Sequence, residues 1–520
     1  MTDELLDSLV VPPAFSRYDG ISDVGIVSGL QGWQTKLVPT LSRLSPSSLP
    51  TTEQAKLVRV LAPLTAQDAP WTNAKSRTLA NALLAAITPT PALVKDILDN
   101  GVKPLFSATP HPRLHTGTAR VLAHPADSQD PFHHQPWKDH PGLDEVIRWC
   151  ILNTQPSAYD QTWPLILPPI MTFLDDYEVP YKIRGVHLVS KMLTRVPPNL
   201  LLRTGVDGLL FTSLINALNH LRDPSTPELI RAVVPTTIQL IDLTTPSQFS
   251  DAISLCPRPP LSTERLESKD LTFSLSPSIK KTLFIRFTRL STLLSSSILG
   301  TIIMYTPTIV PPDSATAPDP FSDPEHVESD SESFTVKSMQ TTAPEKNAPH
   351  PTLVAAAHVL PLVIASLGIG ATRFLKGIVP VVTGWLALPI PTPPSSSSVT
   401  GDGIGIATEV PDKVMPLQAS RGGLLDLHLA ALHIIHVLLD TCVPRIEHWA
   451  TTIVDGLARC WVGCVDVTNA GVPLPDVKAL QKALQETAVE LSDKFPSIVK
   501  NEFRQLLDFN STLFGGLINS

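Results

Sequence analysis

The segments YKIRGVHLVSKML at 181–193 and LLRTGVDGLLFTSL at 201–214 decide the fold class of this chain. In the first segment apolar residues recur at the spacing of one helix face, at Ile183, Val186, Val189 and Leu193. In and after the second they recur at Val206, Leu210, Leu214, Leu218 and Leu221. Neither segment alternates as a half-buried strand does. The spacing predicts helices at 180–196 and 206–221.

Outward from this region, the same periodicity predicts helices on both sides. They cover 143–153, 163–174, 224–243, about 279–304, 424–439, 446–461, 474–491 and 496–507. Successive helix pairs recur at roughly 40 residues, which is the period of HEAT-like repeats. The repeats lack strict self-similarity, so helix count and spacing carry the interpretation. We expect an all-α, HEAT-like helical repeat solenoid with long disordered loops.

Composition divides the chain into five regions. They are an N-terminal helical region at 1–102, a signature helical region at 136–245, a connection and helix at 246–310, an acidic Pro/Ser insert at 311–349, and a C-terminal helical region at 350–520. The stretch at 103–135 is rich in Pro and His and is expected to be a loop. The insert at 311–349 has almost no large apolar side chains, which predicts disorder. A second break is expected at 389–405.

The overall composition limits the function classes. Hydrophobic residues make up 43% of the 520 residues, and the formal net charge is −8 with no basic run. A nucleic-acid-binding surface needs clustered Lys and Arg, so none is expected. The 52 prolines suit many short helices that each begin or end at Pro. The five scattered cysteines indicate a reduced, intracellular protein, and the acidic start MTDELLDSL is not expected to act as a signal peptide.

Two apolar runs raise the question of a membrane. Residues 353–372 contain no charged side chain, and 374–390 are also apolar. His358, Pro361 and a Gly-Ile-Gly sequence at 368–370 interrupt the first run. Two helices buried inside a stack explain both runs better than a membrane pair, because such helices are apolar all round.

Three groups of polar residues could carry chemistry. His428, His433 and His436 lie on one predicted helix, and Cys460 and Cys464 are spaced for one face of another, so a zinc site is an alternative to buried core residues. The loop histidines His111, His115, His133, His134 and His140 are irregularly spaced, which favours a hydrogen-bonded loop. We expect core histidines and buried thiols rather than a metal site.

The acidic residues Asp175, Asp176 and Glu178 could form an acid/base pair. They lie in a turn between two predicted helices, and Lys182 and Arg184 follow one turn later, so we expect ion pairs there instead. No nucleophile elbow, phosphate loop or dinucleotide motif occurs. The chain is therefore expected to have no catalytic residues, no metal and no cofactor.

The acidic insert carries two candidate phosphorylation sites. Ser322 and Ser329 each have an acidic residue three positions later, in SDPE and SDSE, a pattern that acid-directed kinases favour. Phosphate there would strengthen a docking motif for a basic pocket.

Four motifs of the central region resemble the TEL-two-interacting protein two family. They are PWKDHP at 136–141, WPLILPPIMTFLDDYE at 163–178, YKIRGVHLVSKML at 181–193 and LLRTGVDGLLFTSL at 201–214. The resemblance covers 136–245 well and the rest loosely. It draws attention to nine signature or partner-binding candidates: Trp137, Lys138, Asp139, Asp175, Asp176, Lys182, Gly185, Arg203 and Gly205.

The resemblance implies a non-catalytic subunit of the TTT co-chaperone complex. Its partners would be the two larger TTT subunits, chiefly the long HEAT-repeat one. Through them it would act with the ninety-kilodalton heat-shock chaperone on phosphatidylinositol-3-kinase-related protein kinases, with links to the DNA damage response and telomere maintenance. A cytoplasmic location is expected, with a nuclear pool left open, and no nucleic acid or membrane is expected as a partner. The alternative is another HEAT-type adaptor for transport or assembly.

Overall fold

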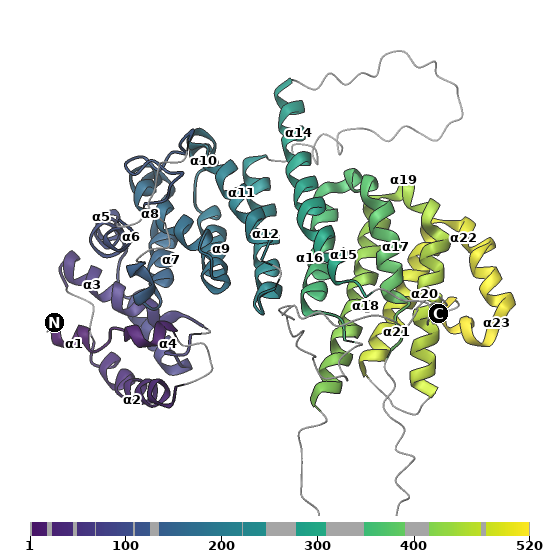
Figure 1. Ribbon diagram of the computed structural model, residues 1–520, viewed down its shortest axis with the longest axis horizontal. Helices are drawn as coiled ribbons and strands as arrows, with labels where there is room; N and C mark the ends of the chain where they lie inside the picture. The colour runs from purple at the N-terminus through teal and green to yellow at the C-terminus, as the bar shows by residue number, and fades with distance from the viewer. Residues whose placement is uncertain are drawn as a thin grey trace, which may run out of the picture. The chain divides into compact units, whose positions relative to one another are not determined.

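The computed structural model describes eleven stretches of the chain and divides it into two compact units, Met1–Leu293 and Leu294–Ser520. The described residues are 3–17, 23–44, 49–67, 69–107, 110–124, 135–220, 222–245, 277–307, 348–390, 415–469 and 475–518. Within these stretches the regular elements are helices, apart from one isolated bridge between Leu114 and Val121. The all-α, HEAT-like prediction is confirmed (Figure 1).

The first unit stacks helices in sequence order. Its α-helices are α1 (Asp3–Asp7), α2 (Val24–Leu41), α3 (Thr51–Leu61), α4 (Ala74–Ala85), α5 (Pro91–Asp96), α6 (Lys103–Phe106), α7 (Leu143–Asn153), α8 (Tyr159–Leu174), α9 (Val179–Leu193), α10 (Pro198–Thr204), α11 (Val206–Ala217), α12 (Thr226–Thr244) and α14 (Pro277–Thr292). Helix α9 packs against α7, α8 and α12, and α12 packs against α11 and α14. Arg289 of α14 pairs with Asp207 of α11 at 2.7 Å.

The prolines behave differently from the prediction. Many do stand at a helix start, as Pro180 does in α9. However, α8 carries Pro164, Pro168 and Pro169 in its interior, and it begins at Tyr159 rather than at Trp163. Helix α8 therefore does not follow the expected pattern of a helix that begins or ends at Pro. The buried side chains on α8, among them Trp163, hold the helix together despite the missing backbone donors.

The loop expected at 103–135 contains a short helix, α6, and the bridge between Leu114 and Val121. Residues 125–134 of that stretch, including His133 and His134, lie outside the described residues. The bridge is anchored to the signature region, because the backbone N–H of Val121 donates to the carbonyl oxygen of Thr204 at 3.2 Å.

The second unit contains α15 (Leu299–Tyr305), α16 (Pro351–Leu367), α17 (Leu375–Leu386), α18 (Met415–Thr441), α19 (Val443–Ile446), α20 (Ala450–Asn469), α21 (Pro475–Lys494), α22 (Pro496–Lys500) and α23 (Glu502–Ile518). Helix α18 packs against α16, α17 and α21, and α20 packs against α17, α21 and α23. The helix expected at 279–304 is divided by a π-helical turn at Leu293–Ile298, which ends α14 and precedes α15.

The two apolar runs form α16 and α17, joined by a 3-10 turn at Gly368–Phe374. Most side chains of α16 are buried in the unit, including its alanines at 355–357. Three helical segments in the described part of the chain are nonetheless long and apolar enough to span a membrane: Lys280–Tyr305, Pro351–Leu386 and Gly422–Thr441. The bent pair Pro198–Thr204 and Val206–Ala217 passes the same test as a fourth.

Other predicted features fall on undescribed residues. Most of the acidic insert, with Ser322 and Ser329, lies outside the described residues, as do 391–405 of the second break and 246–276 of the connection. Cys256 is also outside them. The other four cysteines, Cys150, Cys442, Cys460 and Cys464, are unpaired and buried.

Candidate functional site around Lys138

The start of the signature region places a tryptophan at the centre of an aromatic cluster. Trp137 lies in a 3-10 turn at Pro136–Asp139 and is 1% exposed. Its ring centroid lies 4.6 Å from that of Phe173 and 5.0 Å from that of Tyr181, and it stacks on Phe106 at 5.8 Å. These contacts join α6, α8 and α9 to the turn. Aromatic pairs of this kind add to the stability that apolar burial provides.

The neighbouring lysine is enclosed by aromatic rings and carboxylates. Lys138 Nζ lies 4.4 Å from the ring centroid of Tyr177, 4.7 Å from that of Tyr181 and 5.3 Å from that of Trp137. It also contacts Asp176 Oδ2 at 3.0 Å and Glu178 Oε1 at 2.6 Å. Burial acts to lower the pKa of Lys138, but the hydrogen bonds to Glu178 and Asp176 outweigh it and raise the pKa. The ammonium group is therefore held in its charged form.

Asp176 is the buried member of this cluster. Its side chain is fully buried, and Oδ1 accepts hydrogen bonds from Lys138 Nζ at 3.1 Å and from the backbone N–H of Glu178 at 2.8 Å. Gln135 Nε2 donates to Oδ2 at 3.4 Å. A buried carboxylate with these partners fixes the turn between α8 and α9, and its acceptor atoms are already engaged.

The predicted pairing of the acidic turn with Lys182 and Arg184 is wrong. Arg184 faces Asp144 of α7, with 3.9 Å between the charged atoms. Lys182 is buried and donates to the carbonyl oxygen of Leu174 at 3.5 Å, so it satisfies the end of α8 instead. Burial lowers the pKa of Lys182, and the attraction of Asp175 and Asp176 offsets part of that effect.

Asp175 points to a different partner from Asp176. Its Oδ2 lies 2.9 Å from Nε2 of His111, which comes from the stretch between α6 and the bridge. A second loop histidine, His115, accepts hydrogen bonds from the backbone N–H groups of Gly117 and Thr118 through Nδ1. Both histidines thus serve the hydrogen-bonded loop that their spacing favours.

Gly185 lies where α9 crosses α8. A Cβ atom built on it would lie 2.7 Å from Cα of Leu174 and 2.7 Å from the carbonyl carbon of Phe173, and closer still to the amide nitrogen of Leu174. Backbone atoms cannot swing aside as a flexible side chain can. Gly185 therefore sets the distance between the two central helices of the signature region.

Arg203 and Gly205 lie at a separate bend. Gly205 has φ 72° and ends α10 while it begins α11, and the two helices meet at 87°. This left-handed conformation favours glycine. Arg203 forms an exposed ion pair with Asp160 of α8.

The structure sorts the nine signature residues by exposure. Trp137, Asp176, Lys182 and Gly185 are buried, so their role in this fold is to hold helices together. Asp139, Arg203 and Gly205 are exposed, and Lys138 and Asp175 are partly exposed, so these five are accessible from the surface. The sequence analysis did not single out Tyr177 and Tyr181, whose rings contact the Lys138 ammonium group. Their positions on either side of Glu178 in the acidic turn were the available signal.

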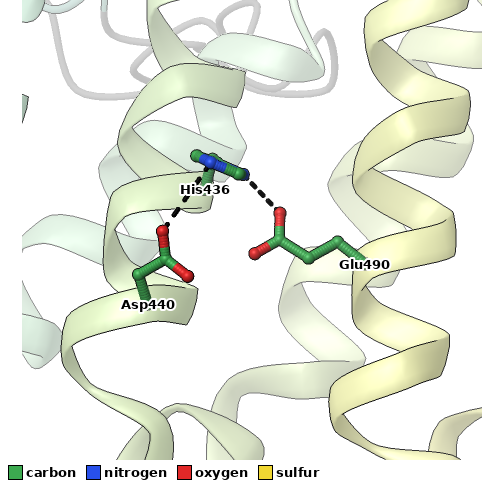
Figure 2. Close-up of side chains that lie close together, drawn as sticks. All are labelled: His436, Asp440 and Glu490. Carbon is green, nitrogen blue, oxygen red and sulfur yellow. Dashed lines mark hydrogen bonds and ion pairs between the residues drawn. The ribbon is translucent and has the colours of Figure 1, made fainter.

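The histidines and cysteines weighed as a zinc site are not brought together. The described residues contain one group with metal-ligand geometry, made by His436 and Asp440 of α18 and Glu490 of α21 (Figure 2). Lys494 Nζ lies 2.6 Å from Asp440 and 2.5 Å from Glu490, so the two carboxylates already share a cation. A hydrogen bond with Cys464 and burial raise the pKa of Cys460, and both thiols lie in the core on α20.

His428 is a core histidine, as expected. It is fully buried on α18, and burial lowers its pKa to about 4, although the backbone carbonyls of Trp385 and Leu388 offset a small part of the shift. Neither ring nitrogen makes a well-formed hydrogen bond in the described part of the chain. The neutral ring is therefore the form that the folded state holds.

Acidification should destabilise the second unit through His428. Its pKa is about 4 when folded and about 6.5 when unfolded, so its contribution is present above pH 6.5 and is lost as pH falls through 4. Between pH 6.5 and pH 4 the free energy of unfolding of the unmodified chain should therefore fall by about 3 kcal/mol more than that of His428→Gln. Denaturant unfolding at several pH values measures it. The exposed His448→Gln is the matched control, because it makes the same substitution at a surface position of the second unit.

Comparison with known proteins identifies relatives in sequence. The sequence profile of the Tti2 family matches residues 57–392, a wider range than the motifs at 136–214 suggested. A mouse protein named TELO2-interacting protein 2 is 32% identical over 107 residues, and its human counterpart is 30% identical over 107 residues. These alignments cover 21% of this chain and 20% of each relative, so the chain matches about a fifth of the curated relatives' length.

Among solved structures, similar chains include the karyopherin Kap121p. The form bound to the SUMO protease Ulp1p has a TM-score of 0.33 and 12% identity, covering 98% of this chain and 43% of that one. The form bound to the extreme C-terminus of the phosphatase Cdc14p has a TM-score of 0.33 and 13% identity, covering 93% and 42%.

Proposed function

The chain belongs to the Tti2 family, and from this we propose that it is a non-catalytic scaffold subunit of the TTT co-chaperone complex. The match over residues 57–392 is the observation that carries the proposal, because it extends over both compact units. The mouse and human relatives are named for an interaction with TELO2. By analogy, this chain would bind the two larger subunits, chiefly the long HEAT-repeat one.

The geometry of the signature region supports a scaffold rather than an enzyme. Its carboxylates are engaged by Lys138, His111 and backbone groups, which rigidifies the α8–α9 turn. A catalytic acid or base instead needs a reachable atom and a substrate pocket. Binding would rest on shape-complementary contact with a polar rim.

In the cell, the proposed complex would act with the ninety-kilodalton heat-shock chaperone on newly made phosphatidylinositol-3-kinase-related protein kinases. Effects on the DNA damage response and telomere maintenance would follow through those kinases. We place this work in the cytoplasm and leave a nuclear pool open. The proposal needs neither a nucleic acid nor a membrane as partner.

A tagged copy of the 520-residue chain should recover both larger TTT subunits in comparable amounts. Affinity purification from its own cells, followed by mass spectrometry, measures this. The exposed variant Arg203→Glu should lower the recovery without changing the folded fraction, because Arg203 forms only a surface ion pair. Recovery of neither subunit by the unmodified chain would contradict the proposal, and recovery of transport factors instead would favour the HEAT-type adaptor alternative.

A further inference from the structure

The first unit contains a cleft of about 640 Å³ whose lining residues do not belong to the cluster around Lys138. Helices α1 and α3 line it together with the turns around Asn100 and Pro141. Most of its walls are apolar, with Leu6, Val10 and Leu143 among them. The cavity lies within the size range of small-ligand sites.

One cation in this cleft lacks a partner. Arg59 of α3 is half-buried and lines the cleft, yet it makes no ion pair or hydrogen bond within the part of the chain that the structure describes. The neighbouring Lys56 pairs with Glu53 at 3.3 Å. A guanidinium carries five N–H donors in a fixed fork. Because those of Arg59 have no acceptor among the described residues, they are free to donate to a carboxylate of a bound ligand.

The local backbone positions this guanidinium. A Cβ atom on Gly101 would lie 3.4 Å from both Cγ and Nε of Arg59, and closer still to Cδ, so the glycine makes room for the arginine stem. Gly101 belongs to a π-helical turn at Ile97–Val102. Such turns are rare and are frequently found at functional sites.

We propose that this cleft binds an acidic, apolar segment of a partner protein, whose carboxylate pairs with Arg59 while its apolar side chains fill the walls. The inference rests on the proposed function and deepens it, since the segment would belong to one of the larger TTT subunits. A bidentate arginine suits a carboxylate. Asp7 also lines the cleft, so a segment that brings one carboxylate to Arg59 fits better than a phosphate-rich ligand, whose several negative charges would be repelled by Asp7.

Arg59→Glu should reduce recovery of the larger subunits by roughly tenfold or more, because a charge-assisted pair becomes a repulsive one. The matched control is Arg43→Glu, an equal charge change on an exposed residue of the same unit. Gly101→Ala should also reduce recovery by displacing the stem of Arg59. Circular dichroism and melting temperature show whether each variant is folded. If Arg59→Glu does not fold, the milder Arg59→Ala replaces it in the recovery measurement.

Cross-linking identifies the occupant directly. A photoreactive benzoylphenylalanine in place of Val10, which is 45% exposed at the cleft, is used in the assembled complex. We expect a cross-link to an acidic, apolar segment of a larger subunit. A cross-link to a second copy of this chain, or equal recovery by folded Arg59→Glu and the unmodified chain, would overturn the inference and leave the proposed function intact. Failure of the unmodified chain to recover either subunit would overturn both.

Discussion

Gly185→Ala is expected to lower the free energy of unfolding of the first unit by about 2 kcal/mol or more. The added methyl group would meet backbone atoms of Phe173 and Leu174 at 2.7 Å, so α8 and α9 must move apart. Alanine is about 1 kcal/mol more favourable than glycine inside a helix, which offsets only part of this strain. Denaturant unfolding, read together with hydrogen exchange of the α8 and α9 amides, measures the loss.

The matched control is Gly208→Ala on α11 of the same unit. A Cβ atom there would have no neighbouring heavy atom within 4 Å. The helix preference of alanine should then act alone and stabilise the unit by up to about 1 kcal/mol. The two substitutions are chemically identical. Changes of opposite sign in the free energy of unfolding would therefore show that the close crossing of α8 and α9 causes the loss at Gly185. Equal effects at the two positions would mean that the α8–α9 distance is not set by Gly185.

Periodicity was sufficient to predict the helices whose buried face is long and regular. The helix expected at 143–153 coincides with α7, which follows Gly142 in a left-handed conformation. The helix α10 was not predicted, because its seven residues are too few to show a periodic pattern. The start of α8 at Tyr159, four residues before the expected Trp163, was also not anticipated, since tertiary packing there overrides the preference of Pro164 for the first turn of a helix.

The candidate site was predicted as a set of residues but not as a set of contacts. Lys138 and Asp176 are 38 positions apart in the chain, and no periodic pattern relates a 3-10 turn to a later helix connection. The nearby cations at 182 and 184 were therefore the natural partners to expect for the acidic turn. Lys138 is the partner instead, because its side chain lies among the rings of Trp137, Tyr177 and Tyr181 and from there reaches both Asp176 and Glu178.

Lys138→Met is expected to destabilise the first unit strongly. Methionine keeps most of the apolar stem but removes the charge, so the fully buried Asp176 loses its ion-pair partner. Removing one member of a buried pair typically costs about 3–5 kcal/mol. Asp176→Asn should also destabilise, and the double variant should lose less than the sum of the two, which a double-mutant cycle measures. Denaturant unfolding of all four proteins at neutral pH provides the cycle.

The exposed pair of Arg203 and Asp160 supplies the control for this cycle. Both side chains are more than half exposed, at 55% and 61%, so Arg203→Met should cost at most about 1 kcal/mol. The pH dependence distinguishes the two pairs further. The pKa of Lys138 is raised on folding, so its contribution is fully present below the unfolded value of about 10.4 and is lost as pH rises through the folded one. The deficit of Lys138→Met should therefore stay constant from about pH 7 to 9 and shrink above about pH 10. If Lys138→Met lost no more unfolding free energy than Arg203→Met, the contacts of Lys138 would stabilise the fold by packing alone and not by its charge.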